Sequence, residues 1–305
     1  MRARLAILLG LVAIVAGCGE RSEPIGALPV FPQTASDGLN REVDVTEAPK
    51  RIVSLDPGLT DAAFQIGAGP LIVGGTGDET QPAQAQHLPS MLDDSGGPDI
   101  KAIRKKAPDL VVVPSGMVTD KAAADQLANQ IGANVYVSDN TSVDAIEHDI
   151  LQLGLMTGHS GEARGVFSDM QRRIDAITSQ FKGQPPVPVF IDRGYRYTIP
   201  AEGLAADLVK LAGGENVAAD ADPNTPVSPA QLRADAPQVY IAQAGTGVTL
   251  EGLRRSPATK TIPAVQQRNF AIIPESVLEA SGPEVVHSLE TLARDIHPDL
   301  EMGSQ

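Results

Sequence analysis

The chain has 305 residues and is 42% hydrophobic, which allows one large domain or two lobes with a sizeable core. Its formal net charge of −14 argues against nucleic acid as a partner and against a chain that lies flat on an anionic membrane surface. Cys18 is the single cysteine, so no internal disulfide can form, and the lack of tryptophan excludes a tryptophan-walled ligand site.

The N-terminus has the pattern of a secretion signal. Arg2 and Arg4 precede an apolar run over residues 5–16, and small residues come directly before Cys18. The run is shorter than the roughly 20 apolar residues that cross a bilayer comfortably. The plainer alternatives are a signal peptide with an incidental cysteine and a short membrane anchor.

The segment Ala16-Gly17-Cys18 resembles the lipobox of bacterial lipoproteins. The resemblance implies a signal peptide over residues 1–17, cleavage before Cys18 and lipid attached to its sulfur, which gives stable anchoring when several acyl chains are present. We therefore expect an exported lipoprotein, anchored to the outer face of the bacterial cell membrane. Residues 18–40 are rich in Pro, Gly, Ser and Ala without apolar periodicity, and are expected to form a flexible tether.

An N-terminal α/β lobe is predicted over residues 41–157, beginning with a short alternating strand at 41–45. Apolar runs without alternation are typical of parallel strands buried on both faces, and they alternate here with helical segments. The strands are expected at 51–55, 71–74, 110–113 and 134–137, and the helices at 60–66, 100–106, 121–131 and 142–156.

A long amphipathic helix is predicted over residues 161–182, within a bridging segment at 158–184, and Pro185-Pro186 ends it. A second α/β lobe follows over residues 185–305. Its strands are expected at 187–191, 239–242 and 270–273, and its helices at 204–212, 228–234 and 283–296. The predicted fold class is therefore α/β, with two lobes of mainly parallel sheets flanked by helices and bridged by one long α-helix.

Several short motifs resemble the class III periplasmic binding proteins, the solute-binding components of importers for iron siderophores, haem and cobalamin. The resemblance spans Asn40 to Leu300 and implies a ligand cleft between two lobes, with small closure because a rigid helix joins them. The motifs stand at residues 48–57, 66–74, 103–111, 211–217 and 281–283.

Candidate ligand-binding residues follow from the rule that ligands of open α/β sheets lie at the carboxyl ends of the strands. The loop with Arg193, Tyr195, Arg196 and Tyr197 is the strongest candidate, because guanidinium groups bind oxyanions and stack on rings. Its plainer interpretation is that Asp192 neutralises surface arginines while the tyrosines cap the lobe core.

Five further residues at predicted strand ends are ligand candidates. Asp78 and Glu79 could accept hydrogen bonds from a ligand or could be solvated loop carboxylates, and Asp56 could instead cap the following helix. The full additional set is Asp56, Asp78, Glu79, Ser115 and Glu275.

Two positions matter for docking on a permease, according to the resemblance. Many members of the family carry one glutamate on each lobe that meets permease arginines, and the matching positions here are Lys101 and Ala230. Asp99 or Asp93-Asp94 could substitute on one lobe and Asp235 on the other. The departure keeps open a second function, a surface-tethered binding or interaction lipoprotein that is not coupled to a permease.

No catalytic, metal or cofactor site is predicted. The five histidines show no paired ligand spacing, the nucleophile-elbow motif is absent, and neither Gly-x-Gly pair has the third glycine of a dinucleotide fingerprint. We expect a monomeric, non-enzymatic protein that captures a metal chelate and delivers it to an ABC importer. Because Arg193 and Arg196 suit anionic oxygens, a ferric siderophore is the first choice, with cobalamin or haem as the alternatives.

Overall fold

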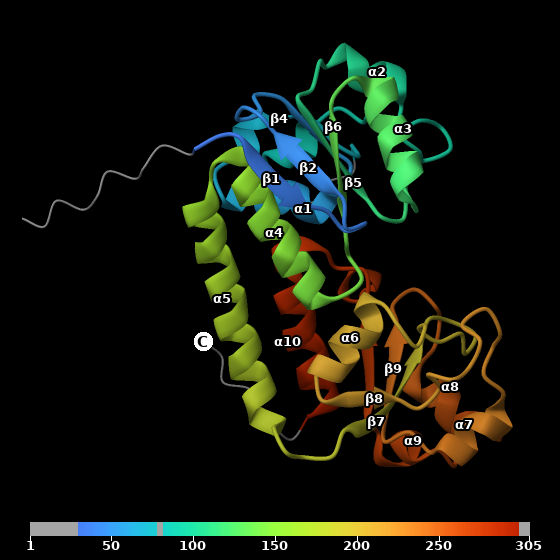
Figure 1. Cartoon of the computed structure of the whole chain (residues 1–305). Coiled ribbons are helices and arrows are strands. Elements are labelled where there is room, and N and C mark those ends of the chain that lie inside the picture. Colours follow the sequence, from blue (N-terminus) through green and yellow to red (C-terminus); the bar gives the residue numbers. More distant parts are fainter. Residues whose placement is uncertain (1–29, 78–81, 299–305) are drawn as a thin grey trace, which may run out of the picture.

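The computed structural model describes residues 30–77 and 82–298, which form two α/β lobes joined along one side by long helices (Figure 1). The predicted fold class is confirmed. Cys18, Asp78 and Glu79 lie outside the described residues. Among the described residues, no helix combines the length and the apolar character needed to cross a membrane.

The N-terminal lobe is built on a parallel sheet with the strand order β4-β3-β5-β6. Ile52 and Leu110 pack on one face with α1, whereas Val53 and Val111 pack on the other face with α2 and α3, which is why the strands are uninterrupted apolar runs. The elements are β3 (Ile52–Ser54), α1 (Pro57–Gln65), β4 (Ile72–Gly74), α2 (Ile100–Lys105), β5 (Leu110–Pro114), α3 (Lys121–Ile131) and β6 (Asn134–Ser138).

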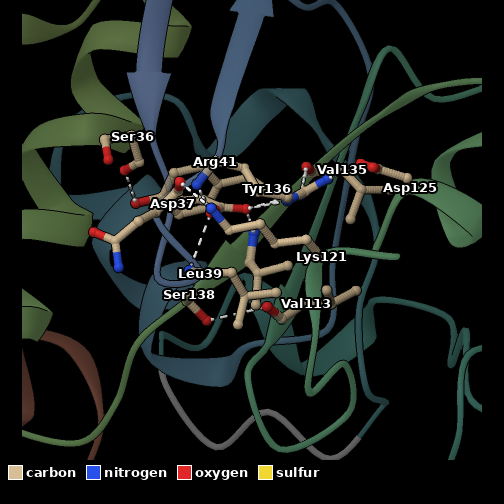
Figure 2. Close-up of polar contacts among 12 residues, drawn as sticks. Ser36, Asp37, Leu39, Arg41, Val113, Lys121, Asp125, Val135, Tyr136 and Ser138 are labelled. Atoms are coloured by element: carbon tan, nitrogen blue, oxygen red, sulfur yellow. Dashed lines mark hydrogen bonds and ion pairs between the residues drawn. The ribbon is translucent and has the colours of Figure 1, made fainter. Parts of the chain in front are cut away.

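The folded body begins earlier than predicted, because the last residues of the predicted tether form β1 (Gln33–Ser36). This strand pairs antiparallel with β2 (Glu42–Val45). Asp37, in the turn between them, is buried and accepts hydrogen bonds from the Arg41 side chain, which also donates to the Val135 carbonyl at 2.7 Å (Figure 2). The sequence of β1 does not predict a strand, because it is mostly polar and only Ala35 faces the core.

Two helices lead from the first lobe to the second. α4 (Val143–Thr157) follows β6, and α5 (Ser160–Thr178) runs back alongside it toward the second lobe (Figure 1). A 3₁₀ turn at Ser179–Phe181 completes the predicted bridging segment. The buried residues Met170 and Ile174 of α5 belong to one hydrophobic cluster that continues into both lobes. The bridging helix α5 is therefore packed against the core of the protein along its buried face.

The C-terminal lobe repeats the topology of the first, with the parallel order β10-β9-β7-β8. Val189 and Ile191 face the cluster shared with α6 and α10, whereas Phe190 and Tyr240 face α7, α8 and α9. The elements are β7 (Val187–Asp192), α6 (Leu204–Leu211), β8 (Gly214–Asn216), α7 (Pro229–Asp235), β9 (Val239–Gln243), α8 (Leu250–Arg255), α9 (Pro263–Gln267), β10 (Phe270–Ile273) and α10 (Val285–Ile296).

The lobes also meet at a contact between two glycines, apart from the bridging helices. Gly58 in the first turn of α1 lies against Gly282, which opens the 3₁₀ turn Gly282–Glu284 before α10. A Cβ atom on Gly282 would stand 2.2 Å from the Gly58 carbonyl oxygen, so only glycine fits. Nearby, the backbone N–H of Val143 donates to the carboxylate of Asp207 across the lobes at 2.9 Å. These contacts fix the lobes relative to each other.

Candidate functional site

A cleft of about 470 Å³ lies between the lobes, within the roughly 300–1,000 Å³ typical of small-molecule sites. The first lobe contributes residues at the carboxyl ends of β3, β5 and β6. The second lobe contributes the segment before and at the start of α6 and the segment after β10. The lining residues are Pro57, Pro114, Asn140, Pro200, Glu202, Gly203, Leu204, Ala205, Leu278, Glu279, Ala280 and Ser281.

The topology explains this position. In each lobe the second strand in chain order pairs on one side of the first strand, and the third strand pairs on its other side. The strand order therefore reverses between β3 and β5 in the first lobe, and between β7 and β9 in the second. Loops leave such a point in opposite directions and open a crevice at the carboxyl ends of the strands. The first lobe therefore lines the cleft with residues directly at its strand ends, and the second lobe with segments that follow β7 and β10.

Asp56 is removed from the ligand candidates, because the structure shows the capping role that was its alternative. Its carboxylate is fully buried and accepts hydrogen bonds from the backbone N–H groups of Gly58 and Leu59 at 2.9 and 3.1 Å. Its second oxygen accepts from Ser138 Oγ at 2.5 Å and from Asn140 Nδ2 at 3.0 Å. Asp56 therefore holds Asn140 in the wall of the cleft without facing the cleft itself.

Asp192 has the corresponding place in the second lobe, and its role was not predicted. Its buried carboxylate accepts from the backbone N–H groups of Gly194 and Arg196 at 2.8 and 2.9 Å, and from the Tyr240 hydroxyl. It therefore shapes the candidate loop instead of neutralising the arginine side chains. Burial and the Asp192 carboxylate together raise the pKa of Tyr240, which stays a neutral donor.

The two arginines of the candidate loop have different positions. Arg193 reaches the cleft edge, where Nη2 pairs with Oε1 of the cleft residue Glu279 at 3.4 Å. Arg196 points elsewhere, because its Nε donates to the Val227 carbonyl at 2.9 Å, beside the start of α7. The structure thus brings one of the two predicted guanidinium groups to the cleft, and that one is already paired.

The two tyrosines of the loop do not cap the lobe core. Tyr195 is 81% exposed and Tyr197 is 36% exposed, so both rings can meet a partner from solvent. Ser115 is half-buried directly after β5, and Glu275 is exposed two residues after the end of β10, so both lie near carboxyl strand ends as expected. Neither lines the cleft, and both remain candidates from sequence.

The two docking positions are exposed. Lys101 lies on α2 and Ala230 on α7. Of the carboxylates that could substitute, Asp99 is committed to capping α2 through the N–H of Ala102, and Asp235 accepts from the Gln231 side chain. Asp93 accepts several hydrogen bonds within its own loop, mainly from Ser95, which lower its pKa.

A larger cavity, of about 650 Å³, is not the candidate site. It lies at the opposite edge of the first sheet, beside the amino ends of β5 and β6, and its lining includes Glu47 and Lys50 from the segment before β3 and Asn129 from α3. Ligands of open parallel sheets bind at the carboxyl ends. No group of three or more His, Cys, Asp and Glu side chains suited to a metal ion occurs in residues 30–77 and 82–298.

Four polar cleft residues were not predicted as ligand residues, namely Asn140, Glu202, Glu279 and Ser281. Asn140 could have been found, because it follows the predicted strand at 134–137 and belongs to a carboxyl strand end. Glu202 lies ten residues beyond the end of β7, and Glu279 lies beyond the 3₁₀ turn Glu275–Val277, so their place depends on how the chain returns to the cleft. No local pattern marks them.

Comparison with known proteins agrees with this architecture. Over 307 aligned residues the chain is 23% identical to YvrC, a substrate-binding lipoprotein of an ABC transporter from Bacillus subtilis, with 96% of each chain covered. It is 27% identical over 222 residues to a vitamin B12-binding protein from Yersinia pestis, covering 72% of this chain and 78% of the relative.

The solved structures place the fold in the same group. A possible iron-binding, periplasmic solute-binding protein from Staphylococcus epidermidis superimposes with a TM-score of 0.70 at 19% identity, covering 82% of this chain and all of the other. Residues 52–277 match the periplasmic binding protein family, whose members bind solutes and are not enzymes, as predicted. The chain belongs to the periplasmic binding protein family.

Proposed function

We propose that this protein captures a metal chelate in the cleft between its lobes and delivers it, as a monomer, to an ABC importer. The observation that carries the proposal is the cleft itself, a small-molecule-sized space between the lobes that is lined by residues at the carboxyl ends of β3, β5 and β6 and by segments that follow β7 and β10. A relative named for vitamin B12 and a similar fold described as possibly iron-binding support a chelated metal as the ligand class. A ferric siderophore remains the first choice, with cobalamin and haem as alternatives.

Delivery to an importer is tested by uptake. Cells that contain the chain are expected to take up the bound chelate, in radiolabelled form, faster than cells from which its gene is deleted. The alternative function, a surface-tethered binding lipoprotein, is favoured by Lys101 and Ala230, which replace the expected docking glutamates. If the chelate binds to the purified protein while uptake does not change on deletion, delivery is refuted and this alternative holds.

We also propose that Cys18 carries the lipid that keeps the protein at the outer face of the cell membrane. The support is the lipobox-like segment before Cys18 and the lipoprotein name of the relative from Bacillus subtilis. The wild-type chain is expected in the membrane fraction after ultracentrifugation, and Cys18→Ser in the exported soluble fraction. Recovery of both chains in the same fraction would refute lipid anchoring at this residue.

A further inference from the structure

The cleft is lined by carboxylates and apolar surface, with no cationic side chain among the described lining residues. Glu202 and Glu279 are its charged groups, and proline, leucine and alanine form most of the rest. Arg193 is paired with Glu279 at 3.4 Å, so these two charges offset each other. Glu202 then gives the cleft lining a net negative charge, in agreement with the negative charge of the whole chain.

Two other features, the N-terminus of α6 and Arg196, could offset the negative charge of the cleft, and neither does. The N-terminus of α6 opens into the cleft with its partial positive charge, but Asp207 lies in the first turn of the helix and offsets it. Arg196 is turned away, since its Nε donates to the Val227 carbonyl. The cations that could hold an anionic ligand are thus either paired or directed elsewhere.

A second cavity between the lobes, of about 440 Å³, is also lined by carboxylates and lies on the far side of the segment 278–281. Glu279 lines both cavities, and this one adds Asp61 and Glu284, with His287 as its one basic group. Burial raises the pKa of Asp61, whereas Glu279 and Glu284 are exposed. Both inter-lobe cavities therefore favour cations over anions.

We propose that the cleft selects a neutral or cationic metal chelate with an apolar periphery, and that Glu202 and Glu279 set this selectivity. The inference rests on the proposed function and narrows it. A strongly anionic ferric chelate would meet the Glu202 and Glu279 carboxylates, and it could reach the Arg193 guanidinium only by displacing Glu279. A cationic chelate would gain from them, and a neutral one would be held mainly by the apolar walls.

The test is calorimetric titration of the full-length protein with three ferric chelates of different charge. The probes are cationic ferrioxamine B, neutral ferrichrome and the anionic ferric complex of enterobactin. The cationic or the neutral probe is expected to bind at least about tenfold more tightly than the anionic one. Tightest binding of the anionic probe would overturn the charge inference and leave the proposed function intact, whereas binding of no probe and of neither haemin nor cobalamin would remove both.

Variants test the two carboxylates. Glu202→Gln and Glu279→Gln are each expected to improve binding of the anionic chelate several-fold, and Glu279→Gln more so, because it also frees Arg193. Glu251→Gln on α8 removes an exposed carboxylate that does not line the cleft, and is the matched control. Equal affinities of all three variants and wild type for the anionic chelate would refute the role of Glu202 and Glu279.

Discussion

Replacement of Gly282 by alanine is expected to destabilise the protein by about 3 kcal/mol. The added Cβ would lie 2.2 Å from the carbonyl oxygen of Gly58 and 2.8 Å from its Cα, and both neighbours are backbone atoms that cannot rotate away. The φ of +59° at Gly282 adds the cost of a left-handed conformation. Either the lobes separate at this contact or the native state loses stability.

Urea denaturation measures the stability, and small-angle X-ray scattering measures the separation of the lobes. Gly132→Ala is the matched control, because Gly132 also has a positive φ, 81°, but a Cβ there would meet nothing within 4 Å. The control is expected to lose about 1 kcal/mol from backbone strain alone. If Gly282→Ala were no less stable than Gly132→Ala and had the same radius of gyration, the glycine contact would not hold the lobes together.

The free energy of unfolding is expected to decrease as the pH rises from about 4 to about 8, with Asp149 as a main cause. Asp149 is buried on α4, where its carboxyl group lies 2.5 Å from the Tyr136 hydroxyl and 2.6 Å from the backbone nitrogen of Asp139. Burial raises its pKa to about 8. The folded protein therefore holds this proton more tightly than the unfolded chain, whose aspartates titrate near 4.

The sign of the effect follows from this difference in proton binding. The stabilising contribution of the protonated group is complete below about pH 4 and is lost by about pH 8, a change on the order of 6 kcal/mol. Asp149→Asn cannot ionise, so its stability should vary less with pH, and comparison with wild type removes the contribution of other groups such as Asp61 and His297. Parallel stability curves for the two proteins, measured by urea denaturation, would contradict the prediction.

The long elements could be predicted because their patterns are strong. The parallel strands carry apolar residues on both faces, and the bridging helix α5 presents apolar residues at helical spacing. β1, β8, α8 and α9 were missed, since none exceeds six residues and their stability comes from tertiary contacts. β1 in particular is held by the Asp37–Arg41 pair and by its pairing with β2, which a local pattern does not reveal (Figure 2).

The position of the cleft could be predicted from the sequence, but the side chains that line it could not. The predicted strand ends identify the carboxyl edge of each sheet, and the loop from Arg193 to Tyr197 does begin at the carboxyl end of β7. The direction of each side chain depends on hydrogen bonds that form only in the fold. Arg196 turns toward Val227, and Glu279 arrives beside Arg193 from a segment 86 residues later. The sequence therefore did not predict that Glu202 and Glu279 line the cleft while Arg196 points away from it.

The most direct test of the account is a calorimetric titration of the purified wild-type protein with ferric siderophores, haemin and cobalamin, repeated on Ala205→Trp. Ala205 lines the cleft, so a tryptophan there should fill it, whereas Asn129→Trp in the larger cavity of the first lobe is the control. We predict saturable one-to-one binding of at least one chelate with a Kd below about 1 μM, retained in Asn129→Trp and abolished in Ala205→Trp. Binding of none of these chelates to the wild type, or unchanged binding to Ala205→Trp, would contradict a chelate site in the inter-lobe cleft.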